Sequence, residues 1–321
     1  MLSSTTRTLE SERARRIEAP HAPHRPEMVW IPSGSFDMGS NDFYAEEAPV
    51  RRVTVAGFWI DVRPVTNREF ARFVMETNWI TTAEIAPLAE DYPGAMLERL
   101  VPSSLVFTPT KRPVDLRDPG QWWRYVAGAD WRHPYGPDSN LEGLLDHPVV
   151  HVAWRDVEAY SRWAKAAVPT EVEWEYAARG GLDGRPFAWG DELQPAGAEM
   201  ANIWQGRFPY ENRAAFWQRT SPVGAYPPNG YGVYDMIGNV WEWTIDWWST
   251  AKAREGCCAL EDPRIASMDP RDDCRIPRKV LKGGSHLCAP NYCQRYRPAA
   301  RHAHPIDTST SHIGFRCVVR S

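Results

Sequence analysis

Two cysteines five positions apart, Cys288 and Cys293, are the residues of this 321-residue chain best suited to chemistry. They lie in the stretch GGSHLCAPNYCQRYR, where Pro290 and Asn291 favour a turn that brings the two side chains together. Two adjacent thiolates can form a disulfide, supply half of a zinc site, or bind a soft monovalent ion such as Cu(I) with only two ligands. A pair of buried thiols without further chemistry fits the spacing equally well, because unlinked cysteine is among the most buried residue types.

Zinc is the weaker of the metal alternatives. A structural zinc site needs four ligands, and three histidines, His286, His302 and His304, lie near the cysteine pair in the sequence. No second CxxC pair accompanies them. The other four cysteines also lie in the last fifth of the chain, at Cys257, Cys258, Cys274 and Cys317. We therefore expect no disulfide framework spread through the fold.

Hard oxygen ligands gather in a second segment, YGVYDMIGNVWEWTIDWW, over residues 231–248. Asp235, Asn239 and Glu242 are separated there by a glycine turn, and carboxylates with backbone carbonyls between them suit Ca²⁺. The alternative for this segment alone is structural. Asn239 would then cap a turn, and Glu242 would be a solvated or ion-paired charge.

Charge argues against nucleic acid as a partner. The chain has 37 basic and 41 acidic residues, a formal charge of −4, although residues 271–321 carry ten Arg and Lys against three Asp. Within that basic end, Arg295, Arg297 and Arg301 alternate with Tyr292 and Tyr296, a pattern that favours buried stacked or ion-paired arginines. No HExxH, GxSxG or Walker segment is present, so metalloprotease, hydrolase-elbow and nucleotide-binding activities have no motif.

Composition indicates an irregular fold. The chain has 22 Gly and 28 Pro, which favour turns and argue against a helix bundle, and its 16 Trp and 12 Tyr must fill a core or line a binding surface. No apolar run approaches the ~18 residues that a membrane helix needs, and the N-terminus lacks the apolar core of a signal peptide. We expect a soluble, cytoplasmic protein.

The elements that must position these residues are short. Residues 1–26 read as a flexible polar arm and residues 27–321 as one domain. Two short strands are expected over 28–40, one strand over 50–62, and a last strand from His312. Capping boxes at Thr66 and Thr170 predict helices, the second ending at Arg179 before Gly180, and apolar spacing predicts another helix from Trp154.

A long aperiodic stretch, from about residue 88 to residue 146, separates the first two predicted helices. A loop of this length inside a compact domain is usually functional. We expect it to pack on the surface through its tryptophans, and we expect Trp122, Trp123 and Trp131 to contribute to a recognition surface together with carboxylates from elsewhere.

Five segments taken in order carry a resemblance: MVWIPSGSFDMGS, PTEVEWEYAARGG, NGYGVYDMIGNVWEW, KGGSHLCAPNYCQRYRPAAR and SHIGFRC. Over residues 27–321 the chain resembles the formylglycine-generating enzymes, the sulfatase-modifying factor family, in its bacterial cytoplasmic form. The resemblance implies an α+β, loop-rich single domain of the C-type-lectin-related kind, with little regular secondary structure. The GGSxxCxxxYC segment is specific to members that convert cysteine to formylglycine.

The resemblance implies a mechanism and a partner. Cys288 and Cys293 would hold Cu(I), and the cysteine of a CxPxR motif in an unfolded sulfatase would bind as a third thiolate. Oxygen and a thiol reductant would then convert that cysteine to Cα-formylglycine. Ser285 and Tyr292 match pocket positions and would place the substrate sulfur and oxygen. A monomer is the family's usual form.

The resemblance also implies calcium. One site maps onto Asp235, Gly238, Val240 and Glu242, and a second onto Asn202 and Ile203. At the second site Ala215 stands where an acidic residue is expected, in the stretch ENRAAFW, so Trp217 would supply at most a carbonyl.

Two positions where relatives form disulfides differ in this chain. Ser161 occupies the position of the partner cysteine of Cys317, which is therefore expected to be a free buried thiol, and Pro298 replaces another cysteine. Both differences fit a reducing cytoplasm. Cys257, Cys258 and Cys274 have no implied role, and inert loop cysteines, a labile thiol pair and an adventitious metal site all stay open.

Two alternatives to the oxidase belong to other classes. A non-catalytic protein- or sugar-binding module on the same fold would have no use for Cys288 and Cys293 in one turn. An iron-dependent sulfoxide synthase would need a helical domain with an HxxxHxE pattern before Met28, and no such pattern is present. Since a fold can host many functions, the site segment carries the prediction.

Overall fold

A four-stranded sheet lies at the centre of the molecule, which is described by a computed structural model over residues 25–249 and 262–320. Its strand order is β11-β10-β9-β12. β10 pairs antiparallel with both β9 and β11, and β12 pairs parallel with β9. The strands are β9 (Trp241–Trp247), β10 (Arg278–Lys282), β11 (Arg301–Pro305) and β12 (Ile313–Gly314). The connection from β10 to β11 carries the cysteine pair.

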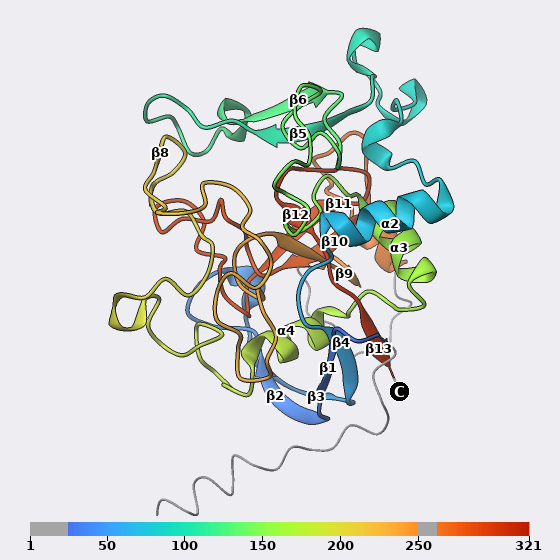
Figure 1. The fold of residues 1–321 in the computed structure, drawn as a ribbon. Coiled ribbons are helices and arrows are strands. Elements are labelled where there is room, and N and C mark those ends of the chain that lie inside the picture. Colours follow the sequence, from blue (N-terminus) through green and yellow to red (C-terminus); the bar gives the residue numbers. More distant parts are fainter. Residues whose placement is uncertain (1–24, 250–261, 321) are drawn as a thin grey trace, which may run out of the picture.

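Two smaller sheets occupy the lower end of the molecule in Figure 1. The first has the order β1-β4-β13, and the second is the antiparallel pair β2-β3. Their strands are β1 (Met28–Ile31), β2 (Gly34–Met38), β3 (Arg51–Val55), β4 (Phe58–Asp61) and β13 (Val318–Arg320). The two short strands expected over 28–40 are confirmed, although each pairs with another partner.

Two expected strands are in fact divided. The segment 50–62 breaks into β3 and β4, which belong to different sheets, because the chain turns at Gly57. A Cβ on Gly57 would lie 2.3 Å from the Trp30 ring, so only glycine allows this close approach. The segment from His312 likewise divides into β12 and β13.

The three predicted helices are confirmed. They are α2 (Asn67–Thr77), α3 (Trp154–Trp163) and α4 (Glu171–Arg179), and a short α5 (Pro263–Ala266) follows later. Thr66 and Thr170 each accept a hydrogen bond from the backbone of the third helical residue, and the glutamates Glu69 and Glu173 complete the capping boxes. Gly180 ends α4 in the left-handed conformation at φ 57°.

The long stretch from residue 88 to 146 contains a β-hairpin that its aperiodic sequence does not predict. β5 (Ser103–Phe107) pairs antiparallel with β6 (Trp123–Ala127) at the top of the molecule, and short 3-10 turns flank the pair (Figure 1). Trp122 and Trp131 are 0% and 3% exposed, so the expectation that they form a recognition surface is wrong. They fill the core instead, and Trp123 alone of the three is half-buried. A minor hairpin joins β7 (Gly206–Arg207) to β8 (Glu211–Asn212).

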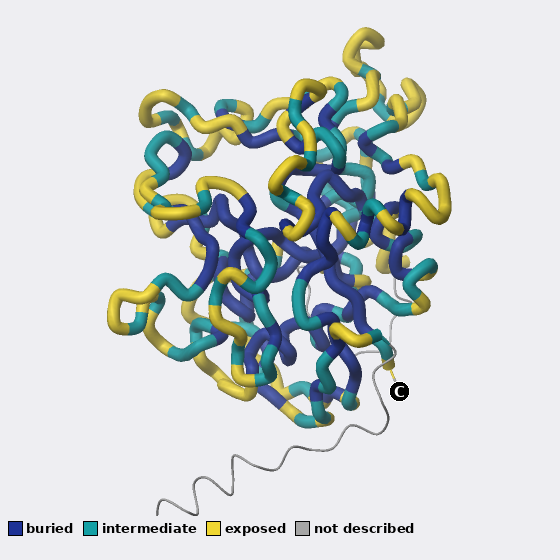
Figure 2. The backbone as a smooth tube through the Cα atoms, in the orientation of Figure 1, coloured by how far each residue is buried: buried dark blue, intermediate teal, exposed yellow. Residues whose placement is uncertain are grey.

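Burial is concentrated around the central sheet, as the dark interior of Figure 2 shows. One apolar cluster joins α2 and α3 to the sheet through aromatic rings, with Phe70 stacked on Tyr160 and Tyr160 edge-on to Phe315. A second cluster fills the space between α4 and the lower sheets. No helix in the described residues is both long and apolar enough to cross a membrane. Residues 1–24 of the predicted arm lie outside the described residues, and Arg25 forms an ion pair with Asp61.

Buried ion pairs neutralise the basic C-terminal end, as the alternation of arginine and tyrosine predicts. Arg297 donates to both oxygens of Glu47 at 2.6 and 2.7 Å, with 1% and 0% of the two side chains exposed. Arg301 makes a bidentate pair with Glu171 at 2.8 Å. Such pairs fix geometry strongly, since a lone buried charge is far more costly than a buried pair.

We expect Arg297→Met to lower the free energy of unfolding by about 3–5 kcal/mol, because it removes the buried guanidinium that pairs with both oxygens of the Glu47 carboxylate. Urea denaturation measures the change. The matched control is Arg68→Met, whose partner Asp146 is exposed, and it should cost less than about 1 kcal/mol. Equal losses from the two variants would contradict the importance of burial, and adding Glu47→Leu to Arg297→Met should recover part of the loss.

Candidate functional site

The loop that carries the cysteines leaves β10 through two glycines that the geometry requires. Gly283 and Gly284 have φ of 92° and 72°. A Cβ on Gly283 would lie 2.8 Å from the Met236 carbonyl oxygen, and one on Gly284 would lie 2.8 Å from the Arg295 carbonyl oxygen. The chain can therefore fold back on itself here only with glycine at both positions.

Two tight turns then bring the thiols together. The Cys288 N–H donates to Ser285 O at 2.9 Å, and the Cys293 N–H donates to Ala289 O at 2.8 Å. The sulfurs lie 3.2 Å apart, which is a hydrogen-bond contact and well beyond the ~2.05 Å of a disulfide. The sequence prediction that the turn unites Cys288 and Cys293 is confirmed, and both are free.

The two thiols differ in environment. Burial raises the pKa of Cys288 well above its ordinary value. The pKa of Cys293 is lowered to about 7, because Cys293 forms a hydrogen bond with Cys288 and lies near the Arg295 guanidinium. Cys288 is buried and Cys293 is partly exposed. At neutral pH Cys288 is therefore a thiol, whereas Cys293, the more exposed of the two, is partly ionised to the thiolate.

Arg295 is held by residues far away in the sequence. Its guanidinium donates to Glu46 at 2.6 Å and lies 3.9 Å from the centroid of the Tyr44 ring. The Tyr44 hydroxyl accepts a hydrogen bond from the Gln294 N–H at 3.0 Å. The partners Tyr44 and Glu46 were not among the predicted site residues, and no sequence pattern links them to a loop 249 positions away.

Aromatic rings form a wall beside the sulfurs. Tyr292 stacks on Phe208 with ring centroids 4.4 Å apart, and it meets Trp122 edge-on at 5.4 Å. The Asn291 side chain ties the loop to the same wall, since it accepts from the Phe208 N–H and donates to the Phe208 carbonyl. Tyr292 is 39% exposed and so faces the opening of the site. Burial of its hydroxyl and the adjacent thiols raise the pKa of Tyr292 to about 12.

Ser285 lies on the buried side of the pair. It is fully buried, its N–H donates to the Cys288 sulfur at 3.4 Å, and its hydroxyl accepts from the Leu287 N–H at 3.2 Å. The sequence thus brings together Ser285, Cys288, Tyr292 and Cys293 in one turn. Two adjacent unlinked sulfurs are the donors that a soft monovalent ion prefers, so the residues fit Cu(I).

The histidines do not join the cysteines. His286 pairs its Nδ1 with Asn239 O at 2.8 Å, and His304 pairs its Nε2 with Thr308 O at 3.0 Å, while the His302 ring lies against Trp241. Among residues 25–249 and 262–320, no three His, Cys, Asp or Glu side chains are grouped to hold a metal ion. The three histidines therefore do not join the cysteine pair in a zinc site.

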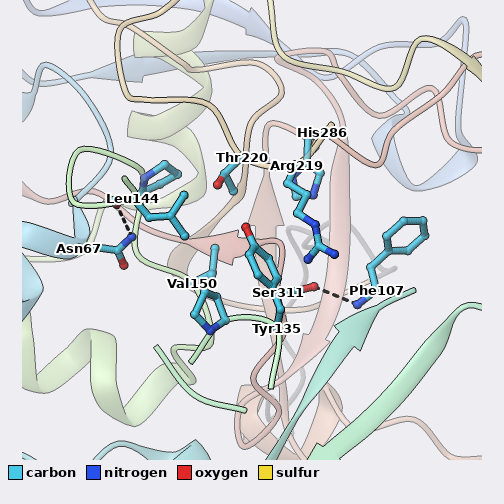
Figure 3. Close-up of a pocket in the computed structure, with 11 residues that line it drawn as sticks. Asn67, Phe107, Tyr135, Leu144, Val150, Arg219, Thr220, His286 and Ser311 are labelled. Atoms are coloured by element: carbon cyan, nitrogen blue, oxygen red, sulfur yellow. Dashed lines mark hydrogen bonds between the residues drawn. The ribbon is translucent and has the colours of Figure 1, made fainter. Parts of the chain in front are cut away.

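A small pocket adjoins this loop at His286 and is shown in Figure 3. Its volume is about 20 Å³, room for about one water molecule. Arg219 stacks over Tyr135 at 3.6 Å along one side, and Ser311 accepts a hydrogen bond from the Phe107 N–H. The pocket is too small for a peptide side chain, and we assign it no role.

The oxygen-rich segment fits a cation in part. Asp235 is buried, and burial raises its pKa to about 6, while the carbonyl oxygens of Gly238 and Val240 accept no hydrogen bond within the described residues. These three groups are available as oxygen ligands for a cation. Glu242 is not available, because both of its oxygens accept from Arg316 at 2.7 Å and one also accepts from the Trp174 indole at 2.8 Å.

The second predicted calcium site lies directly beside the first. A Cβ on Gly238 would be 2.4 Å from the Asn202 carbonyl oxygen and 3.1 Å from the Ile203 side chain. Asn202 commits its amide nitrogen to Arg219 O at 2.8 Å. Trp217 lies edge-on to His147, and Ala215 supplies no carboxylate. Asn202 and Ile203 remain a prediction for a second calcium.

The remaining cysteines take no part in the site. Cys317 is free and fully buried, as expected, and Cys274 is free and partly exposed. Cys257 and Cys258 lie outside the described residues. Nothing in the described residues gives Cys274 a partner thiol or a metal.

The described residues form a loop-rich α+β domain with two free thiols in the turn between strands β10 and β11 of the central sheet. Residues 14–321 match the family described as "Sulfatase-modifying factor enzyme 1-like domain", and the chain belongs to that family. The resemblance and the expected fold are confirmed.

The individual relatives agree. The chain is 54% identical over 303 residues to the formylglycine-generating enzyme of Mycobacterium tuberculosis, covering 91% of this chain and 97% of that one. It is 45% identical to the mouse formylglycine-generating enzyme, covering 90% and 74%. The solved structure of PvdO from Pseudomonas aeruginosa, at 23% identity, covers 92% of this chain and 95% of its own with a TM-score of 0.60, which shows a shared fold.

Family membership alone does not decide activity. A bovine relative that is 38% identical, covering 90% of this chain and 87% of its own, is named an inactive formylglycine-generating enzyme. The decision therefore rests on the residues of the site, and above all on the thiol pair.

We expect alkylation of the reduced, metal-free protein by iodoacetamide to single out Cys293. Since only the thiolate reacts, the rate should rise with pH through a midpoint near 7, whereas an ordinary cysteine has its midpoint about two units higher. Peptide mass spectrometry after timed quenching identifies the modified residue. The Cys293→Ser protein should lose this phase, and preferential alkylation of Cys288 would contradict the assignment.

Proposed function

We propose that the chain is a copper-dependent oxidase that converts the cysteine of a CxPxR motif in an unfolded sulfatase to Cα-formylglycine, using O₂ and a thiol reductant. The observation that carries the proposal is the pair of free sulfurs of Cys288 and Cys293, 3.2 Å apart in one turn. Relatives named formylglycine-generating enzyme, with identities up to 54% among those compared, support it. We further propose that it acts in the cytoplasm as a monomer.

The two cysteines would hold the copper ion. Bound Cu(I) would supply the redox chemistry with O₂, and the thiol reductant would supply the remaining two electrons. Cys293 already offers a thiolate near neutral pH, so binding there needs little deprotonation. Cys288 is fixed through its carbonyl, which accepts from the Trp204 N–H at 3.0 Å, so the buried ligand cannot move away.

The other side chains of the turn would receive the substrate. A peptide that approaches from solvent meets Tyr292 and Cys293 first, because these are the exposed members of the group. Tyr292 stays protonated at neutral pH, since its pKa is about 12, and its hydroxyl can donate a hydrogen bond to the peptide. Ser285 would position the substrate sulfur from the buried side. Both are assigned to orientation and not to bond making.

We also propose calcium binding at Asp235 and the carbonyls of Gly238 and Val240, with Asn202 and Ile203 as a second site; Glu242, the fourth residue of the predicted set, is instead paired with Arg316. Support comes from the buried Asp235 carboxylate and the two free carbonyls. The segment also supports the active loop, because Gly238 N–H donates to Gly283 O at 3.0 Å and His286 N–H donates to Asn239 O at 3.0 Å. A cation there would stiffen the base of the cysteine turn.

The reduced protein loaded with Cu(I) should convert a CxPxR peptide under air with a thiol reductant. Conversion replaces the thiol-bearing CH₂ with an aldehyde, a mass loss of about 18 Da that hydrazide capture confirms. We expect Cys288→Ser and Cys293→Ser each to reduce kcat/KM by at least about a hundredfold, because each removes a metal ligand. Cys274→Ser, a free cysteine away from the turn, is the matched control and should retain activity.

Absence of conversion by the folded, copper-loaded protein would contradict the enzymatic proposal. In that case a non-catalytic module that binds a protein or a sugar becomes the better explanation. Conversion that survives the loss of either cysteine would instead contradict the assignment of the metal ligands.

Removal of calcium with a chelator should lower the melting temperature, and returning Ca²⁺ should restore it, because the ion binds only the folded state. Differential scanning fluorimetry measures the shift. Asp235→Asn keeps the size of the side chain but removes its charge, so we expect it to abolish most of the response to Ca²⁺. An unchanged response in this variant would exclude Asp235 as a ligand.

A further inference from the structure

A large groove lies between residues 82–103 and the β5-β6 hairpin, two segments found at the top of the molecule in Figure 1. It encloses about 1020 Å³. Apolar side chains line it although they are exposed, with Leu88 at 59% and Tyr125 at 68%, and Ile85, Met96 and Val101 are exposed as well. A contiguous exposed apolar surface of this kind marks an interaction site.

The strand β6, which lines the groove, pairs with β5 along one edge and, in the described part of the chain, has no strand along its other edge. Leu105 of β5 donates its N–H to Ser309 O at 3.1 Å and accepts from the Ser311 N–H at 2.9 Å, so its backbone groups point away from β6. Leu105 and its opposite residue Tyr125 are therefore a non-hydrogen-bonded pair of the antiparallel ladder. It follows that the N–H and C=O of Tyr125 point outward from β6. Within the described residues they have no hydrogen-bond partner.

The groove begins close to the candidate active site. Trp122 meets Tyr292 edge-on at 5.4 Å, and the next residue, Trp123, lines the groove. From Trp123 to Ala127 the strand β6 runs along the groove for five residues, a length of roughly 15 Å. The thiol pair and this strand are therefore close enough for one extended polypeptide to reach both.

The charges of the lining do not select a nucleic acid. Its cations are matched in number by carboxylates, the six residues being Arg99, Arg124, Arg155, Asp91, Glu98 and Asp307. A phosphate backbone needs a clear excess of positive charge. An extended polypeptide needs only apolar contacts and a free strand edge, and this groove has both.

We propose that this groove is an exosite for the substrate polypeptide, where an extended apolar segment outside the CxPxR motif adds as a strand to the edge of β6. The proposal rests on the proposed function, because it takes the unfolded sulfatase chain as the occupant. The apolar side chains of that segment would pack against Leu88, Met96 and Tyr125. The exosite would raise the local concentration of the target cysteine at the metal site.

Two substrates test the exosite. One is a short peptide with the CxPxR motif and single flanking residues, and the other extends the same motif by about ten residues of sulfatase sequence on each side, roughly 33 Å when extended. We expect the long substrate to have a KM at least about tenfold below that of the short one. Leu88→Asp places a charge in the apolar contact, so it should raise the KM of the long substrate about tenfold. The same variant should leave kcat/KM for the short peptide unchanged.

Matched variants separate the groove from general effects. Met75→Asp alters a residue of α2 that is 74% exposed outside the groove, and it should leave both substrates unaffected. Tyr125→Ala and Tyr125→Pro both remove the ring, but only the second removes the outward N–H, which an edge strand tolerates. We expect the KM of the long substrate to be higher for Tyr125→Pro than for Tyr125→Ala. Normal turnover of the short peptide shows that both variants fold.

A binding measurement keeps this proposal distinct from the proposed function. Fluorescence anisotropy of the long peptide with serine in place of its target cysteine reports groove binding without turnover, and Leu88→Asp should weaken it about tenfold. Unchanged binding and an unchanged ratio of long to short KM would overturn the exosite even if the short peptide is converted. Concentration-dependent self-association in sedimentation that Leu88→Asp abolishes, with substrate KM unaffected, would likewise overturn it and assign the groove to a second copy.

Discussion

The cysteine turn is irregular backbone, and buried charge pairs hold it in place. Between β10 and β11 the chain has no strand ladder, and three arginines, two in the loop and one at the start of β11, make ion pairs that hold it in place. Arg295 pairs with Glu46, Arg297 with Glu47 and Arg301 with Glu171. Two of these acids belong to one short turn, Ala45–Glu47, which therefore acts as a clamp on the loop. The basic charge of the C-terminal end is a structural requirement of this clamp.

The same clamp sets the electrostatics of the site. Arg295 is fixed by Glu46 and Tyr44, and its charge helps to keep Cys293 a thiolate while burial keeps Cys288 protonated. Two identical side chains thus acquire different protonation states from their surroundings. Without the clamp the cysteines would keep their spacing and Cys288 its burial, but Cys293 would lose the contribution of Arg295 to its lowered pKa.

Short sequence motifs predict those structural features that are formed by residues close together in the chain. The capping boxes at Thr66 and Thr170 place two helices, and the turn residues between Cys288 and Cys293 place the thiols together. Contacts between distant segments could not be predicted in this way. Gly57 divides an apparently continuous strand only because the Trp30 ring packs against it, and Glu46 lies 249 positions from Arg295. Trp122 was expected at the surface for the same reason, since the rings that bury it come from Phe208 and Tyr292.

One side of the cysteine turn is buried and fixed by hydrogen bonds, and the other side is accessible from solvent. Cys288 and Ser285 face the core, where backbone hydrogen bonds from Trp204 and Leu287 leave them one arrangement. Tyr292 and Cys293 face outward along the aromatic wall that ends at Trp122. A substrate cysteine would therefore approach from the side of Cys293, where Trp122 before β6 and Phe208 between β7 and β8 border Tyr292. Since β6 has a free edge and an apolar groove beside it, the β5-β6 hairpin is the path that offers the polypeptide both backbone and side-chain contacts.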